Sequence, residues 1–128
     1  MSVTNKKIVK KIIEVFANSD NNLNLCYLDD DIRWNIVGMP AISGKSDFIK
    51  TINSLELENF RLSNIRNILS EGEFVVVEST NKLVNKLSVT NYTAYCDIYR
   101  IKNEKVYELT TYIVDISSDE KADKKLFT

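Results

Sequence analysis

The feature that most constrains the fold of this sequence is a change of hydrophobic period along the chain. Residues 4–18 place apolar side chains at the i, i+4, i+8 spacing of one helical stripe. From residue 56 onward apolar and polar residues alternate with a period of two, which is typical of strands. Turn-like segments at 71–72, 84–86 and 103–104 divide that second half into four consecutive strands. We therefore expect four antiparallel strands.

The first half adds smaller elements. A short helix is expected over 23–28, ended by the acidic run 29–31. A strand follows over 32–36, and its alternation puts three apolar residues on one face, namely Ile32, Trp34 and Ile36. A third helix ends near Ser54. The order helix, helix, strand, helix and four strands predicts an α+β fold in which the helices cover one face of a curved antiparallel sheet.

Length and charge exclude several classes of protein. The 128 residues fit one domain, predicted over 1–116 and followed by a polar C-terminal tail over 117–128. Seventeen basic and eighteen acidic residues give a net charge of −1, which argues against nucleic acid as a partner. The densest basic group lies on the outer side of the first helix and is read as a solvated face, namely Lys6, Lys7, Lys10 and Lys11.

The chain also lacks sequence signals for a membrane or for export. No apolar run approaches the ~20 residues of a membrane span, and the N-terminus has no apolar signal segment. Two cysteines, Cys26 and Cys96, are too few for a disulfide framework, and both are expected to be buried free thiols. These observations predict a cytoplasmic protein that has no membrane partner.

The absence of histidine limits the chemistry of any site. No Ser-His or Cys-His pair and no histidine metal site can form, so catalysis would rest on carboxylates, tyrosines, lysines or arginines. Three glycines are too few for a phosphate-binding loop. Three consecutive carboxylates at 29–31 cannot converge on one ion without a dedicated loop. We expect neither a metal nor a cofactor.

Three stretches carry a resemblance that covers nearly the whole chain. The first comprises Asn18–Asp20, Leu25 and Leu28–Trp34, the second Gly38, Ile42–Gly44 and Phe48–Ile49, and the third Tyr95–Ile101, Lys105–Val106 and Glu108–Tyr112. In this order and spacing they resemble the SnoaL-like polyketide cyclases and ketosteroid isomerases. These proteins share the cone-shaped fold of nuclear transport factor 2 (NTF2). The resemblance implies a curved sheet wrapped around N-terminal helices, with an internal pocket.

The same resemblance identifies one candidate catalytic residue. The oxyanion-hole aspartic acid of the isomerase falls on Asp97, and the isomerase's general base falls on Ile36 or Asn35. Its oxyanion-hole tyrosine matches Ile12 or Ile13, and the second aspartate of the limonene epoxide hydrolases matches Thr111. Glu104 replaces the glycine of the family's closing hairpin. Of the carboxylates that those chemistries use, only Asp97 is present.

Strand alternation and the resemblance agree on a candidate pocket. They place seven residues on the inward face: Trp34, Ile36, Tyr95, Asp97, Tyr99, Leu109 and Thr111. Burial would raise the pKa of Asp97, which could then act as an acid or a hydrogen-bond donor. Alternatively, Asp97 is a satisfied buried group that bonds a tyrosine or Arg100. Trp34 is read either as plain core or as a wall that stacks a flat ligand.

Three functions remain open at this stage. In the first, the chain binds a small hydrophobic molecule as an isomerase, cyclase or dehydratase that uses Asp97. In the second, it is a non-catalytic carrier or sensor that uses the same pocket. In the third, it is a dimerisation module whose interior is filled with side chains. Whether it is an enzyme is left open. Apolar residues at outward positions also predict a two-fold homodimer that packs through the sheet, namely Ala94, Cys96 and Ile98, joined by Val75 and Val77.

Overall fold

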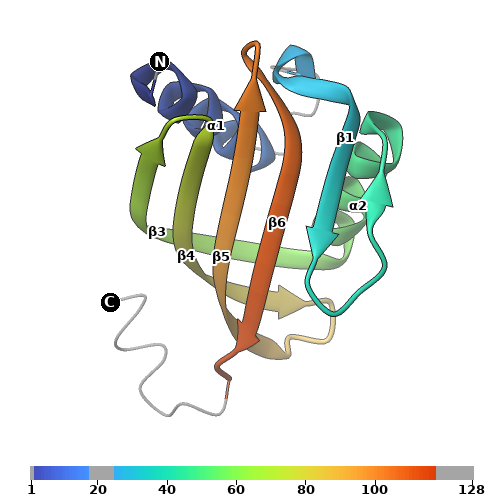
Figure 1. Ribbon diagram of the computed structural model, residues 1–128. Coiled ribbons are helices and arrows are strands. Elements are labelled where there is room, and N and C mark those ends of the chain that lie inside the picture. Colours follow the sequence, from blue (N-terminus) through green and yellow to red (C-terminus); the bar gives the residue numbers. More distant parts are fainter. Residues whose placement is uncertain (1, 18–24, 118–128) are drawn as a thin grey trace.

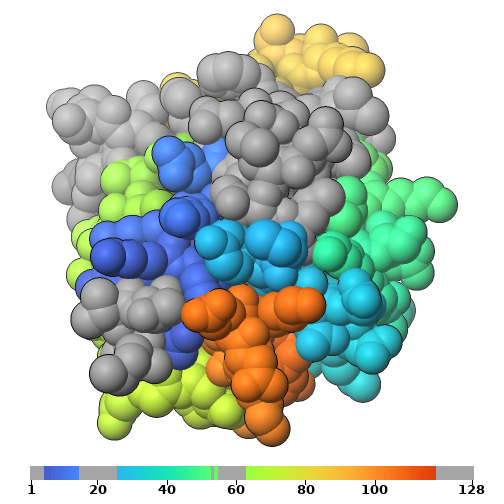
Figure 2. Space-filling view, turned by 90° about the horizontal axis from the view of Figure 1, so that it is seen from above, coloured from blue at the N-terminus to red at the C-terminus, as the bar shows by residue number. Residues whose placement is uncertain are grey.

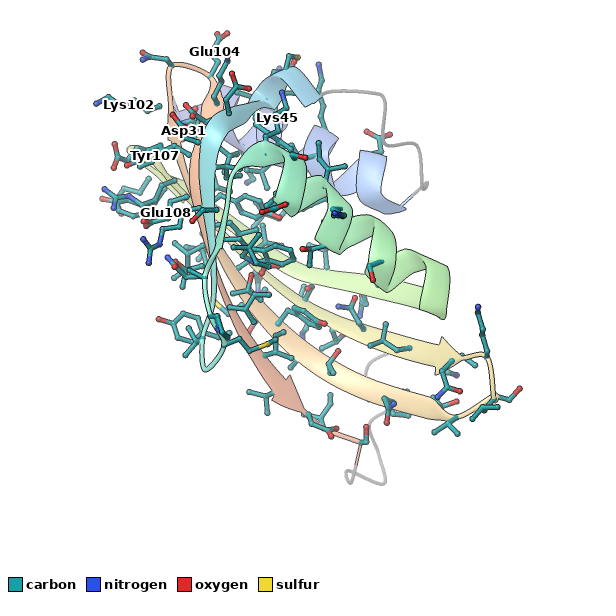
Figure 3. All side chains as sticks on the ribbon, turned by 90° about the vertical axis from the view of Figure 1, so that its right-hand side faces the viewer. Asp31, Lys45, Lys102, Glu104, Tyr107 and Glu108 are labelled. Carbon is teal, nitrogen blue, oxygen red and sulfur yellow. The ribbon has the colours of Figure 1, made fainter. Side chains whose placement is uncertain are left out.

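The structure, a computed structural model, describes residues 2–17 and 25–117 as a curved sheet with two helices against its concave face (Figures 1 and 3). In chain order the elements are α1 (Ser2–Ala17), the 3-10 helix η1 (Leu25–Tyr27), β1 (Leu28–Ile36), β2 (Ile42–Ser43), α2 (Lys45–Glu58), β3 (Asn59–Glu71), β4 (Phe74–Asn85), β5 (Thr90–Lys102) and β6 (Lys105–Asp115). The predicted α+β class is confirmed. The prediction of a polar tail concerns residues that lie almost wholly outside the described part.

The six strands form one sheet in the order β2-β1-β6-β5-β4-β3. The predicted meander of four antiparallel strands, β3 to β6, is confirmed. The sheet as a whole is mixed, because β1 runs parallel to β6. The cause is the path of the chain: α2 carries it from β1 to the opposite edge of the sheet, and the meander then returns to pair with β1 (Figure 1).

The segment before β1 differs from the sequence prediction. Within the described residues, the helix expected over 23–28 is the single turn of η1; residues 23 and 24 lie outside them. The acidic run 29–31 belongs to β1 and does not end a helix. The strand tolerates these residues because its pairing with β6 is irregular between Leu28 and Arg33. Asp29 also accepts a hydrogen bond from the backbone N–H of Asp31 at 2.8 Å.

The core lies between the helices and the concave face of the sheet. Its buried apolar residues come from both helices and from four strands: Ile8, Val9, Ile12, Leu28, Ile32, Trp34, Phe48, Val75, Val77, Tyr99, Ile101, Val106 and Leu109. The prediction that Val75 and Val77 face outward is therefore wrong. They pair with Tyr99 and Asp97 of β5 and point inward, and Val76 takes the outward position between them.

One end of the molecule is closed by α1, η1 and the β5–β6 turn, which lie side by side in Figure 2. The ammonium group of Lys11 lies 5.8 Å from the centroid of the Tyr27 ring across this junction. Lys7, Lys10 and Lys11 are exposed, as predicted, and Lys6 is half-buried. Within the described residues, neither helix has the length and hydropathy that a membrane span requires.

The β5–β6 turn forms without the glycine that the family resemblance predicts. Asn103 and Glu104 both adopt positive φ angles, of 54° and 64°. A two-residue hairpin needs this conformation at both central positions, where asparagine and glycine are favoured. Asn103 fits that preference, and Glu104 holds a left-handed conformation that disfavours residues with a Cβ.

The expectation that both cysteines are buried is wrong for Cys26, which is exposed, whereas Cys96 is half-buried. Cys26 lies in η1, which is too short to present one apolar face to the core. Cys96 lies on the outward side of β5, and desolvation, followed by the negative charges of Asp97 and Glu78, raises its pKa. Both cysteines are free thiols.

Candidate functional site

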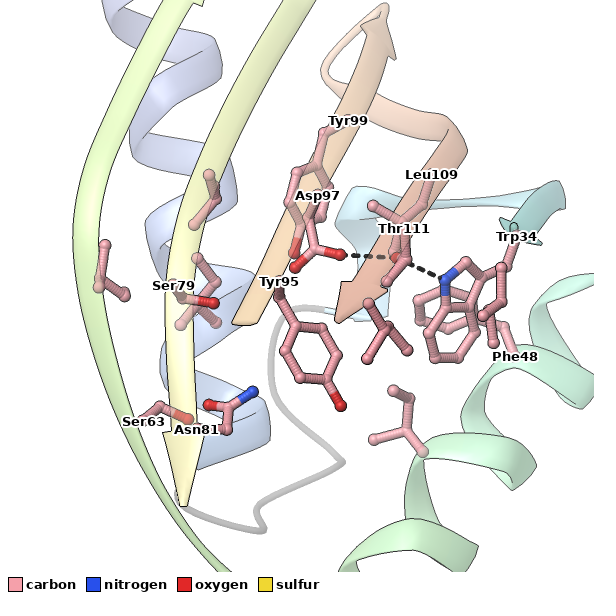
Figure 4. A pocket seen from close by; sticks show the side chains of 16 residues that line it. Trp34, Phe48, Ser63, Ser79, Asn81, Tyr95, Asp97, Tyr99, Leu109 and Thr111 are labelled. Atoms are coloured by element: carbon pink, nitrogen blue, oxygen red, sulfur yellow. Dashed lines mark hydrogen bonds between the residues drawn. The ribbon is translucent and has the colours of Figure 1, made fainter. Parts of the chain in front are cut away.

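A cavity of about 140 Å³ opens between the helices and the concave face of the sheet (Figure 4). Its lining comes from both helices and five strands: Ile13, Trp34, Ile36, Phe48, Ile52, Ser63, Ile65, Val77, Ser79, Asn81, Tyr95, Asp97, Tyr99, Leu109, Thr111 and Ile113. All seven residues that the sequence analysis placed in a pocket line this cavity.

Most of the polar side chains of the cavity come from inward-facing positions of β5 and of the strands paired with it. On β5 the inward residues are Tyr95, Asp97 and Tyr99. Asp97 pairs with Thr111 of β6 on one side and with Val77 of β4 on the other. The carboxyl group therefore projects from the middle of the sheet into a mostly apolar space.

A chain of two hydrogen bonds fixes the orientation of Asp97. The indole Nε1–H of Trp34 donates to Oγ1 of Thr111 at 2.9 Å, and this hydroxyl donates to Oδ1 of Asp97 at 2.6 Å (Figure 4). Indole nitrogen can only donate, so the Thr111 oxygen accepts from it, and the single hydroxyl proton is committed to Asp97. Oδ1 of Asp97 is consequently an acceptor, and donation from Asp97 to a ligand would have to come from its other oxygen.

The surroundings of Asp97 include both a hydrogen-bond partner in the protein and the open space of the cavity. Oδ1 of Asp97 accepts a hydrogen bond from Thr111, and Arg100 points to the opposite face of the sheet. The side chain is half-buried and lines the cavity. Asp97 is thus a bonded polar group that also contacts the space where a ligand would lie.

Trp34 belongs both to the core and to the wall of the cavity. It is 6% exposed and packs in the core, with its ring centroid 5.0 Å from that of Phe48 and the two planes tilted by 47°. It also forms one wall of the cavity. Burial is tolerated because its only polar atom is bonded to Thr111.

Sequence reasoning missed nine lining residues, four of which are apolar side chains of the helices and of β3. The most informative omissions are Ser79 and Asn81 of β4. The alternation Val75, Val77, Ser79, Asn81 was present in the sequence, but the phase of that strand was assigned the wrong way.

A second polar cluster lies on the convex side, away from the cavity; Figure 3 shows Tyr107 and Glu108 pointing outward there. Oε1 of Glu73 accepts from Nη2 of Arg100 at 2.7 Å and from the hydroxyl of Tyr107 at 2.9 Å. These bonds, that of Arg100 first, lower the pKa of Glu73. The Arg100 guanidinium also lies 5.0 Å from the Phe74 ring centroid. This half-buried cluster ties three strands together, and its residues do not line the cavity of Figure 4.

Comparison with solved structures identifies the fold. An NTF2-like protein from Burkholderia xenovorans LB400 superposes with a TM-score of 0.81 at 17% identity, covering 95% of this chain and 98% of that one. A protein from Jannaschia sp. CCS1 assigned as a SnoaL-like polyketide cyclase gives 0.79 at 16%, covering 95% and 92%. An LEH-like epoxide hydrolase from M. tuberculosis gives 0.78 at 17%, covering 88% and 84%.

No protein-family model and no curated protein matches the chain. The structural similarity confirms the NTF2-like fold that the resemblance implied. Proteins of one fold carry different chemistries, so the function has to be argued from the residues of the cavity.

Proposed function

We propose that this NTF2-like chain binds a small, mostly apolar molecule in the cavity, with Asp97 contacting its polar oxygen or nitrogen. The observation that carries the proposal is the Trp34–Thr111–Asp97 hydrogen-bond chain, which orients one carboxyl group inside an otherwise largely apolar space. Ligand sites typically combine such an apolar lining with a few fixed polar groups.

The size of the cavity limits the ligand. Its volume of about 140 Å³ is close to that of an apolar protein cavity of ~150 Å³ known to take up benzene. A single six-membered ring with one or two substituents fills such a space. A fused tetracyclic molecule does not fit inside it.

The lining favours binding over acid–base catalysis. Among the described lining residues Asp97 is the only carboxylate, and of the positions matched to the isomerase's other catalytic groups the two that line the cavity, Ile36 and Ile13, are apolar. Enzymes that move protons at carbon commonly use two groups whose pKa values are pushed apart. A carrier or sensor of a small molecule is therefore the function that the site supports best.

A catalytic role is the second candidate, favoured by the fixed orientation of Asp97. In an isomerase, cyclase or dehydratase reaction Asp97 would exchange a proton with the substrate held at its carboxyl group. Turnover of any member of a panel of small cyclic ketones and epoxides, lost in Asp97→Asn with binding retained, supports this candidate. Binding of such compounds without turnover supports the carrier.

The binding proposal is tested with benzyl alcohol and toluene as probes. The chain has one tryptophan, so its indole N–H gives a single signal in a ¹⁵N–¹H spectrum, and this group lies in the cavity wall. We expect benzyl alcohol to shift that signal. In Asp97→Ala its affinity should fall by about 1–3 kcal/mol, the value of a hydrogen bond to a buried group, whereas toluene affinity should not change.

Glu78→Ala is the matched control, because Glu78 is a carboxylate of the neighbouring strand that is exposed on the convex face. It should leave benzyl alcohol affinity unchanged. An indole signal that does not move at millimolar probe concentration contradicts the proposal. So does an equal loss of toluene and benzyl alcohol affinity in Asp97→Ala.

We also propose that two copies of the chain pair through the convex face of the sheet. This face carries exposed apolar side chains, namely Leu69, Phe74, Tyr112 and Val114, around the half-buried Val76, Ala94, Cys96 and Ile98. An apolar surface of this extent is unusual for a monomer, and the near-neutral charge of the chain imposes little repulsion.

Light scattering at micromolar concentration should give about twice the chain mass of 14.7 kDa. Leu69→Glu should shift the mass toward that of one chain, because it places a charge within the apolar face. Leu87→Glu is the control: Leu87 is 84% exposed in the β4–β5 turn, outside this face. A wild-type mass of one chain contradicts the pairing.

A further inference from the structure

The far end of the cavity contains a buried acceptor that lacks a partner. Asn81 lines the cavity and is only 4% exposed, and its Oδ1 has no hydrogen-bond partner within the described residues. Thr93 lies directly across the strand pair from Asn81, and its buried hydroxyl is likewise unpartnered within that part of the chain. Buried polar groups in folded proteins are nearly always bonded, so each such atom requires an explanation.

The position of Asn81 relative to Asp97 follows from the strand register. Asp97 pairs with Val77, and Asn81 lies four residues further along β4 on the same face. At ~3.3 Å per residue this places the two side chains about 13 Å apart along the strand direction. In Figure 4 the ring of Tyr95 lies below Asp97 and to the right of Asn81.

We propose that the cavity holds its ligand at both ends, and that Oδ1 of Asn81 accepts a hydrogen bond from a second hydroxyl or amine of that ligand. The inference rests on the proposed function and specifies the class of ligand. A ligand that spans this ~13 Å forms one hydrogen bond of ~2.8 Å at each end. Its two polar atoms are therefore roughly 7 Å apart. This separation corresponds to opposite substituents of one six-membered ring.

The accepting character of both ends sets the ligand's chemistry. Oδ1 of Asp97 accepts from Thr111, and a carboxylate can accept further bonds. Oδ1 of Asn81 can only accept. The side chains of Ile65 and Ile113 line the same cavity and contact apolar atoms of a ligand. The ligand is therefore a ring with a hydrogen-bond donor at each of two opposite positions.

Water is the competing occupant of the Asn81 end. A buried water is retained when it makes about three hydrogen bonds to protein groups. A ligand hydroxyl that merely replaces such a water gains little affinity. The experiment therefore compares two probes that differ only in the second hydroxyl, benzyl alcohol and 4-hydroxybenzyl alcohol, with the Trp34 indole signal as the readout.

In the wild-type protein 4-hydroxybenzyl alcohol should bind about tenfold more tightly than benzyl alcohol, which corresponds to one hydrogen bond to a buried, otherwise unpaired group. In Asn81→Leu the two probes should bind equally. In Thr80→Val the tenfold difference should persist. Thr80 is a matched control because its buried hydroxyl also lacks a partner among the described residues, yet it does not line the cavity.

Thermal unfolding without ligand supplies an independent readout. Removing an unpaired buried acceptor should raise the Tm of Asn81→Leu by a few degrees. A lowered Tm means that the Asn81 amide bonds within the protein, and this overturns the inference. Equal affinity of the two probes in the wild type also overturns it, in favour of water. Failure of benzyl alcohol itself to bind instead overturns the proposed function.

Discussion

Replacing Phe48 with alanine should lower the free energy of unfolding by about 3–5 kcal/mol and enlarge the ligand cavity at the same time. Phe48 is 1% exposed, packs against Trp34 and forms part of the cavity wall. Truncation removes its buried apolar surface and leaves a space, because the structure around a truncated core side chain relaxes only partially.

Urea unfolding measures the loss of unfolding free energy. The control is Lys50→Ala, a substitution at an exposed position of the same helix. The enlargement of the cavity is measured with 2-naphthylmethanol, whose two fused rings are too large for the wild-type cavity. It should shift the Trp34 signal in Phe48→Ala but not in the wild type. A loss of stability below about 1 kcal/mol would show that Phe48 does not fill the core as described.

The second large effect is expected for Thr111→Val. This substitution conserves the shape of a side chain that is 1% exposed, but it removes both hydrogen bonds of the Trp34–Thr111–Asp97 chain. The indole N–H of Trp34 then loses its acceptor, and Oδ1 of Asp97 loses the hydrogen bond from Thr111. We expect a loss of about 2–3 kcal/mol, since each unsatisfied buried polar group costs about 1–3 kcal/mol.

Thr110→Val is the control, because Thr110 is half-buried and points to the convex face. It should change stability by much less. The two variants should also differ in the ¹⁵N–¹H signal of the Trp34 indole, which should move in Thr111→Val and stay in place in Thr110→Val. Equal stability losses in the two variants would show that the hydrogen-bond chain contributes nothing specific.

The parts of the fold that the sequence predicted are those in which alternation is unbroken. Apolar and polar residues alternate cleanly at Ile32, Trp34 and Ile36 and along β5, so both strands could be assigned a face. Since Thr111 pairs with Asp97, a correct phase on β5 and β6 was enough to bring the polar groups of the cavity together. For these strands, the two-residue period of the sequence was enough to assign which side chains face the cavity.

The same reasoning failed for β4, where the sequence pattern does not show which residues face inward. Val75, Val76 and Val77 are three identical residues, so their alternation cannot be read, and the polar Ser79 and Asn81 favour an outward assignment. Their true phase is set by pairing with β5, a contact between segments about 20 residues apart in the chain. The parallel pairing of β1 with β6 depends on a still longer connection.

The central claim is that the cavity holds a small molecule at Asp97, and a crystal structure of the protein grown with benzyl alcohol tests it most directly. The account predicts electron density for the ring between Trp34 and Tyr95, with the alcohol oxygen within about 3.2 Å of an Asp97 carboxyl oxygen. A cavity closed by collapsed side chains, or benzyl alcohol bound only on the outer surface, would contradict it.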